Sequence, residues 1–151
     1  MSLSAVMAAI KTIEDGLTIA SPIAVAATDT VAYLITPDKN VKISAKVTFM
    51  NWPDAAKELR MGSDQENGWT IQIDCLVKDA DYDQGAAIAL AFFDATWAAF
   101  TAQQPATARL GGIVDYIGLR AERPLLETIE WGGIGFPGFH MFLDIIDHEV
   151  V

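Results

Sequence analysis

The sequence Trp-Thr-Ile-Gln-Ile-Asp-Cys-Leu-Val at residues 69–77 alternates almost regularly between apolar and polar side chains. This period of two residues is typical of a half-buried β-strand, because successive side chains point to opposite faces of a sheet. Residues 41–49 show the same pattern, with Val, Ile, Ala, Val and Phe alternating with Lys, Ser, Lys and Thr. The sequence therefore predicts two strands that each bury one face.

Helical spacing of apolar residues appears on either side of these strands. It predicts a long helix over residues 84–103, with Pro105 just beyond its end, and a first amphipathic helix over residues 4–15. Because runs of strands separate the helices, we expect an α+β fold, with a mostly antiparallel sheet packed against one long helix plus an N-terminal helix. Further extended segments are expected at residues 23–27, 31–35, 110–119, 125–131 and 137–149.

The chain, residues 1–151, is expected to form a single domain, because this length suits one hydrophobic core. Between the two clearest strands, residues 51–68 lose the alternation and contain Pro53, Gly62, Gly68 and mixed charges. We therefore expect a long loop, since tight hairpins usually use loops of about 2–5 residues.

The 51–68 loop is a candidate partner interface. Interfaces are enriched in Trp, Met and Arg, whereas a solvated loop rarely needs a Trp. The alternative is that the Trp folds back onto its own subunit. The interface candidates are Trp52, Lys57, Leu59, Arg60 and Met61.

Composition and charge exclude several classes of function. The formal net charge of -10 argues against a nucleic-acid clamp and against docking on an anionic membrane. No uncharged stretch approaches the ~20 apolar residues of a membrane helix, and no signal peptide is expected. Hydrophobic residues form 52% of the chain, which favours subunit interfaces. Cys75 excludes an intrachain disulfide and is expected to be buried rather than nucleophilic.

Alternate carboxylates at Asp79, Asp81 and Asp83 resemble the start of a calcium-binding loop. The match then fails, because Gln84 stands where the loop needs Gly and Leu90 stands where it needs a bidentate Glu. A solvated loop before the long helix is the favoured interpretation, and no metal site is predicted.

Two other patterns favour structural interpretations. Gly133-x-Gly135-x-x-Gly138 matches a dinucleotide fingerprint as a string, but a strand follows it instead of a helix, so we expect a hairpin turn. His140 and His148 fall on the same predicted strand about 27 Å apart, too far to share a metal within one straight strand. No catalytic or cofactor-binding residue is predicted.

The order of elements resembles that of the tail-terminator, or tail-completion, proteins of long-tailed bacteriophages. The resemblance covers most of the chain. It is carried by Trp-x-Ile-x-Ile-x-Cys at 69–75, Asp-Tyr-Asp-Gln-Gly at 81–85, Leu-Glu-Thr-Ile-Glu-Trp at 126–131 and Phe-Leu-Asp-Ile-Ile at 142–146.

This resemblance implies a structural virion protein and not an enzyme. It implies a homo-oligomeric ring, typically a hexamer, at the head–tail junction, made in the host cytoplasm and then part of the virion tail or neck. Such a ring caps the tail tube, contacts the tail tube protein and the head connector or stopper protein, and lets DNA pass. The alternatives are another neck or connector ring subunit or, in a different class, a small metal- or ligand-binding domain or enzyme.

An acidic channel wall is expected to repel DNA phosphates and so let the duplex slide, whereas a basic wall would retain it. Contact with passing DNA would therefore be transient and non-specific. The candidate channel-facing acids are Asp64, Glu66, Asp79, Asp81, Asp83, Glu127 and Glu130.

Overall fold

The computed structural model describes residues 3–17, 19, 25–28, 47–61, 64–78, 82–131 and 134–150. For residues 25–28, 55–61, 64–67, 82–83, 122–124 and 147–150 it describes the backbone alone. The elements follow in the order α1 (Leu3–Asp15), β1 (Val25–Thr28), β2 (Val47–Met61), β3 (Asp64–Val77), α3 (Tyr82–Thr101), α4 (Arg109–Gly112), β4 (Tyr116–Trp131) and β5 (Ile134–Val150).

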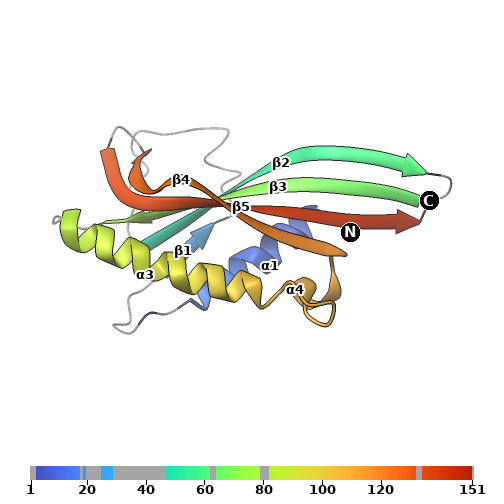
Figure 1. The fold of residues 1–151 in the computed structure, drawn as a ribbon, viewed down its shortest axis with the longest axis horizontal. Helices are drawn as coiled ribbons and strands as arrows, with labels where there is room; N and C mark the ends of the chain where they lie inside the picture. Colours follow the sequence, from blue (N-terminus) through green and yellow to red (C-terminus); the bar gives the residue numbers. More distant parts are fainter. Residues whose placement is uncertain are drawn as a thin grey trace.

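The five strands form one sheet in the order β1-β2-β3-β5-β4. β1 runs parallel to β2, and the other three neighbouring pairs are antiparallel. Figure 1 shows α1 and α3 on the same face of this sheet. The predicted α+β class, with a mostly antiparallel sheet against one long helix and an N-terminal helix, is therefore confirmed.

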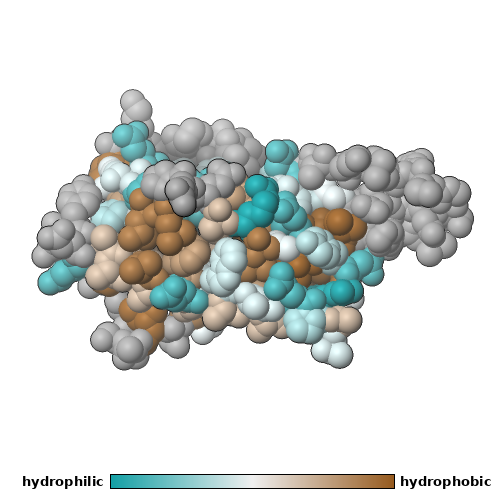
Figure 2. Space-filling view, in the orientation of Figure 1, coloured by the Kyte–Doolittle hydropathy of each residue, from teal (hydrophilic) through white to brown (hydrophobic). Residues whose placement is uncertain are grey.

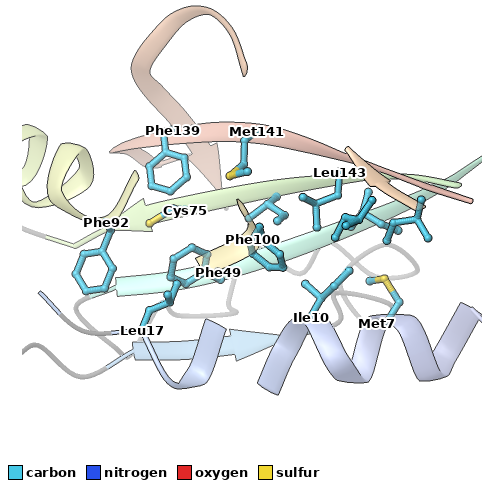
Figure 3. Packing of buried hydrophobic residues seen from close by; sticks show 14 of the residues in the cluster. Met7, Ile10, Leu17, Phe49, Cys75, Phe92, Phe100, Phe139, Met141 and Leu143 are labelled. Atoms are coloured by element: carbon cyan, nitrogen blue, oxygen red, sulfur yellow. The ribbon is translucent and has the colours of Figure 1, made fainter. Parts of the chain in front are cut away.

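The main core lies between the two helices and the sheet. Phe92 of α3 lies edge-on to Phe49 of β2, whose ring also meets Phe139 of β5 edge-on. Figure 3 shows these three rings gathered at one end of the core, with Ile10 of α1 farther along the sheet. This core fully buries Ile71, Ile73, Phe92 and Leu143, and Trp69 and Phe93 pack against it while partly exposed.

A second, smaller cluster lies on the other face of the sheet. Met50, Leu76 and Phe136 are buried there, and Trp52, Ile129 and Trp131 pack against them while remaining partly exposed. The central strands therefore bury side chains on both faces, which explains why Leu76 interrupts the polar side of the predicted strand.

The predicted loop at 51–68 is wrong. Residues 51–61 continue β2 and residues 64–68 begin β3, and the two strands pair as far as Met61 opposite Asp64. A register shift between Ala55 and Lys57 breaks the two-residue period, so the strand cannot be recognised from alternation. Pro53 is tolerated because, among the described residues, β1 pairs with β2 only as far as Met50, so no described strand needs an N–H from the proline.

The predicted strands at 110–119 and 125–131 are in fact one strand, β4, which starts at Tyr116. A register shift between Ala121 and Leu126 separates its two halves. This shift interrupts the alternation of apolar and polar residues, so the sequence predicts two strands instead of one. Before β4 the chain makes a left-handed turn. Arg109 to Gly112 all have positive φ angles, which accounts for the two consecutive glycines there.

The hairpin interpretation of the glycine string is confirmed where the structure describes it. Trp131 pairs with Ile134 across the two strands, and Gly135 and Gly138 both lie within β5. A Cβ atom at Gly138 would lie 2.0 Å from the carbonyl oxygen of Cys75, so glycine allows β5 to approach β3 closely. The predicted segment at 31–35 and residues 41–46 lie outside the described residues.

Candidate functional site

A three-stranded extension of the sheet is the most conspicuous candidate surface. β2, β3 and β5 continue past the helices in Figure 1, and we call this extension the arm, defined as Lys57–Met61, Asp64–Gly68 and Asp147–Val150. Within it Met61 pairs with Asp64, which pairs in turn with Val150. β4 reaches only Ile146, where it begins with Tyr116. Among the described residues, both outer edges of the arm therefore lack a strand partner.

Four of the five interface candidates lie on the outer strand of this arm. They are Lys57, Leu59, Arg60 and Met61, and all four pair through the backbone with residues of β3. Two of the acidic candidates, Asp64 and Glu66, lie on the adjacent strand. The structure thus gathers these residues in one projecting hairpin, in place of the loop expected from the sequence.

Trp52, the fifth candidate, packs against its own chain. Its indole Nε1 donates a hydrogen bond of 2.8 Å to Oδ2 of Asp74, and its ring lies 6.3 Å from that of Trp131. The alternative that this Trp folds back onto its own subunit is therefore correct. Sequence alone could not identify the acceptor, because Asp74 lies on the neighbouring strand.

The face of the sheet opposite the helices, which we call the helix-free face, carries a network of polar side chains. Its members are Gln72, Asp74, Glu127, His140 and Asp144. Gln72 Nε2 donates to Oδ1 of Asp74 at 2.9 Å, and His140 Nδ1 pairs with Oε1 of Glu127. Burial raises the pKa of Asp74, while the hydrogen bonds from Gln72 and Trp52 and the nearby His140 oppose that increase.

The charge of Asp144 on this face is also neutralised within the chain. Arg120 donates to both oxygens of Asp144, at 2.7 and 3.3 Å, and Thr70 Oγ1 donates to Oδ1 at 3.1 Å. The Arg120 guanidinium also lies 4.9 Å from the ring centroid of Phe142. On the helix-free face, the carboxylates of Asp74, Glu127 and Asp144 are therefore each paired within the chain.

The channel-facing candidates do not form one acidic cluster in a single chain. Glu130 is exposed, whereas Glu127 is partly buried and paired with His140. Glu127 lies opposite Gly138 of β5 and Asp64 lies opposite Val150, so the two groups are about 40 Å apart along the sheet. Asp83 lies in the first turn of α3, and Asp79 and Asp81 lie outside the described residues.

The sequence analysis does not predict a buried carboxyl group in α1. Glu14 is fully buried, and Asn51 Nδ2 of β2 donates to its Oε1. Burial raises the pKa of Glu14 to about 8, against an ordinary value of 4.5, and the Asn51 hydrogen bond only partly opposes this effect. Glu14 continues the line of Val6 and Ile10 at a spacing of four residues, and that spacing is the signal that could have revealed its burial.

Cys75 is buried, as expected, and lies on the core face of β3. Burial raises the pKa of its thiol, so the thiolate that a nucleophile requires is disfavoured.

Among the described residues, no group of three or more His, Cys, Asp or Glu side chains is placed to hold a metal ion. His140 and His148 both lie in β5, as predicted. No helix in the described part of the chain is long and apolar enough to cross a membrane.

Comparison with known proteins adds no relative. No protein-family model matches the chain, and no curated protein matches it.

Proposed function

We propose that this protein is a structural subunit of a long-tailed bacteriophage that assembles into a ring at the head–tail junction. In this role it caps the tail tube, contacts the tail tube protein and the head connector or stopper protein, and leaves a channel for DNA. The proposal rests on the family resemblance of residues 69–75, 81–85, 126–131 and 142–146.

The observation that carries the proposal furthest is the arm. A three-stranded projection with two open edges supplies backbone donors and acceptors for a neighbouring chain, and such edges are ready templates for strand pairing. The arm has no described helix beneath it to bury a face of its own. Such a projection suits a subunit that joins neighbouring chains.

The outer surface of α3 gives further support. Leu90 is 43% exposed, and Ala87 and Ala98 are exposed on the same helix, together with the charged Asp94. Figure 2 shows hydrophobic surface gathered over α3. A contiguous exposed apolar surface is typical of protein–protein contact sites.

The acidic composition agrees with a channel for DNA. A net charge of -10 on each subunit would repel phosphates, and Glu130 is an exposed acid of β4 available for that purpose. Glu127 contributes less, because His140 pairs with its carboxylate.

Electron microscopy of the purified protein tests the proposal. We expect closed rings with a central opening, and we expect these rings to bind the end of tubes assembled from the tail tube protein of the same phage. A protein that remains monomeric and gains thermal stability from calcium or a metabolite would instead support the small binding domain, since a ligand that binds only the folded state stabilises it.

A further inference from the structure

The two outer edges of the arm differ in charge. The β2 edge reads Lys-Glu-Leu-Arg-Met at residues 57–61, with two basic residues and one acid. The β5 edge reads Asp-His-Glu-Val at residues 147–150, with two acids and a histidine. An excess of basic residues is uncommon in a chain with 10 Lys and Arg against 20 Asp and Glu. The edges are therefore complementary in charge to each other.

Two other edges in the described part of the sheet are less suited to strand pairing. β2 beyond Met50 contains Pro53, and β4 contains Pro124 next to its register shift. A proline has no N–H to donate, and prolines and bulges on edge strands protect them from pairing with other chains. Neither Lys57–Met61 nor Asp147–Val150 contains a proline.

We propose that the β2 edge of the arm, Lys57–Met61, receives the β5 edge, Asp147–Val150, of a second copy of this chain. This inference rests on the proposed ring and names the surface through which neighbouring copies join. The occupant is a second copy because the chain itself carries both halves of the charge-complementary pair.

The direction of the strands fits such a contact. β2 and β5 both run outward toward the tip of the arm, where Met61, Asp64 and Val150 lie side by side in register. Arms that point the same way around a rotation axis therefore bring β5 of one copy parallel to β2 of the next. Because the two edges are different surfaces, the contact is head-to-tail, and repeated contacts of this kind close into a ring when the rotation permits.

Paired charge reversals test this contact. Lys57→Glu with Arg60→Glu makes the β2 edge acidic, and Asp147→Lys with Glu149→Lys makes the β5 edge basic. In each double variant by itself, the β2 edge and the β5 edge carry net charge of the same sign. We therefore expect the apparent dissociation constant of the assembly to rise on the order of tenfold or more. An equimolar mixture restores opposite charges at every contact, so we expect it to assemble again into particles of alternating subunits.

Light scattering measures the assembly, and far-ultraviolet circular dichroism with thermal melting checks that each variant is folded. Lys78→Glu, which reverses an exposed charge outside the arm, is the matched control and should assemble as the wild type does. The contact is wrong if wild-type rings form but either arm variant assembles equally well, or if two folded variants fail to assemble when mixed. A wild-type protein that stays monomeric contradicts the proposed ring as well.

Discussion

Glu14→Gln should remove a large part of the pH dependence of folding. The folded-state pKa of Glu14 is about 8 and its ordinary value is 4.5, so the folded state holds the proton more tightly than the unfolded chain does. The stability that this group contributes is therefore complete below about pH 4.5 and is lost as the pH rises toward 8. Since one pKa unit corresponds to about 1.4 kcal/mol, the loss between pH 5 and pH 8 is on the order of 4 kcal/mol.

The structural cause is the environment of the carboxyl group. Asn51 donates to one oxygen, and among the described residues Oε2 has no hydrogen-bond partner. Asp15 on the same helix disfavours additional negative charge at Glu14, whereas Lys11 favours it weakly. Gln at position 14 keeps an oxygen that can accept the Asn51 hydrogen bond but cannot ionise.

Urea unfolding followed by tryptophan fluorescence, repeated from pH 5 to pH 9, measures the difference between wild type and Glu14→Gln. We expect the variant to gain stability relative to wild type as the pH rises and the difference to level off above pH 8. Glu130→Gln is the control, because Glu130 is exposed and should leave the pH profile of the wild type unchanged. A difference between wild type and Glu14→Gln that stays constant with pH would refute the reasoning.

Three further predictions concern packing. Gly138→Ala should lower the free energy of unfolding by about 1–3 kcal/mol or more, because the new Cβ would lie 2.0 Å from a backbone oxygen. Gly135→Ala should lower it less, because the nearest atom there belongs to a side chain. Urea unfolding measures both changes. Phe92→Ala should cost about 3–5 kcal/mol and Leu90→Ala less than about 1 kcal/mol, and equal losses in thermal melting would show that the inward face of α3 is misassigned. Cys75 should react slowly with a thiol reagent in the folded protein and rapidly in denaturant, and rapid labelling without denaturant would contradict its burial.

Regular periodicity made part of the fold predictable. The alternation at residues 69–77 and the helical spacing at 84–103 each report one buried face, and both elements appear within a few residues of the expected bounds. The arm could not be predicted in this way. Its strands have no described helix to bury a face against, and the register shift at Ala55 and Lys57 breaks the period.

The polar contacts were also beyond sequence reasoning. The sequence predicts Trp52 to be an interface residue, because it does not reveal that Asp74 of the neighbouring strand accepts a hydrogen bond from the indole. The hydrogen-bond partner of Glu14 could not be identified from the sequence either, because the contact depends on Asn51 of β2 lying against α1. In both cases the partner is distant in sequence, and only the strand register or the helix packing brings the two side chains together.

Native mass spectrometry of the wild-type protein is the most direct test of the account, because the central claim is that the copies join into a closed ring. With subunits of 16.3 kDa, we predict one dominant species near a hexamer, about 98 kDa. This species should dissociate when the charges of only one edge of the arm are reversed. A single species at 16.3 kDa across all protein concentrations would contradict the account.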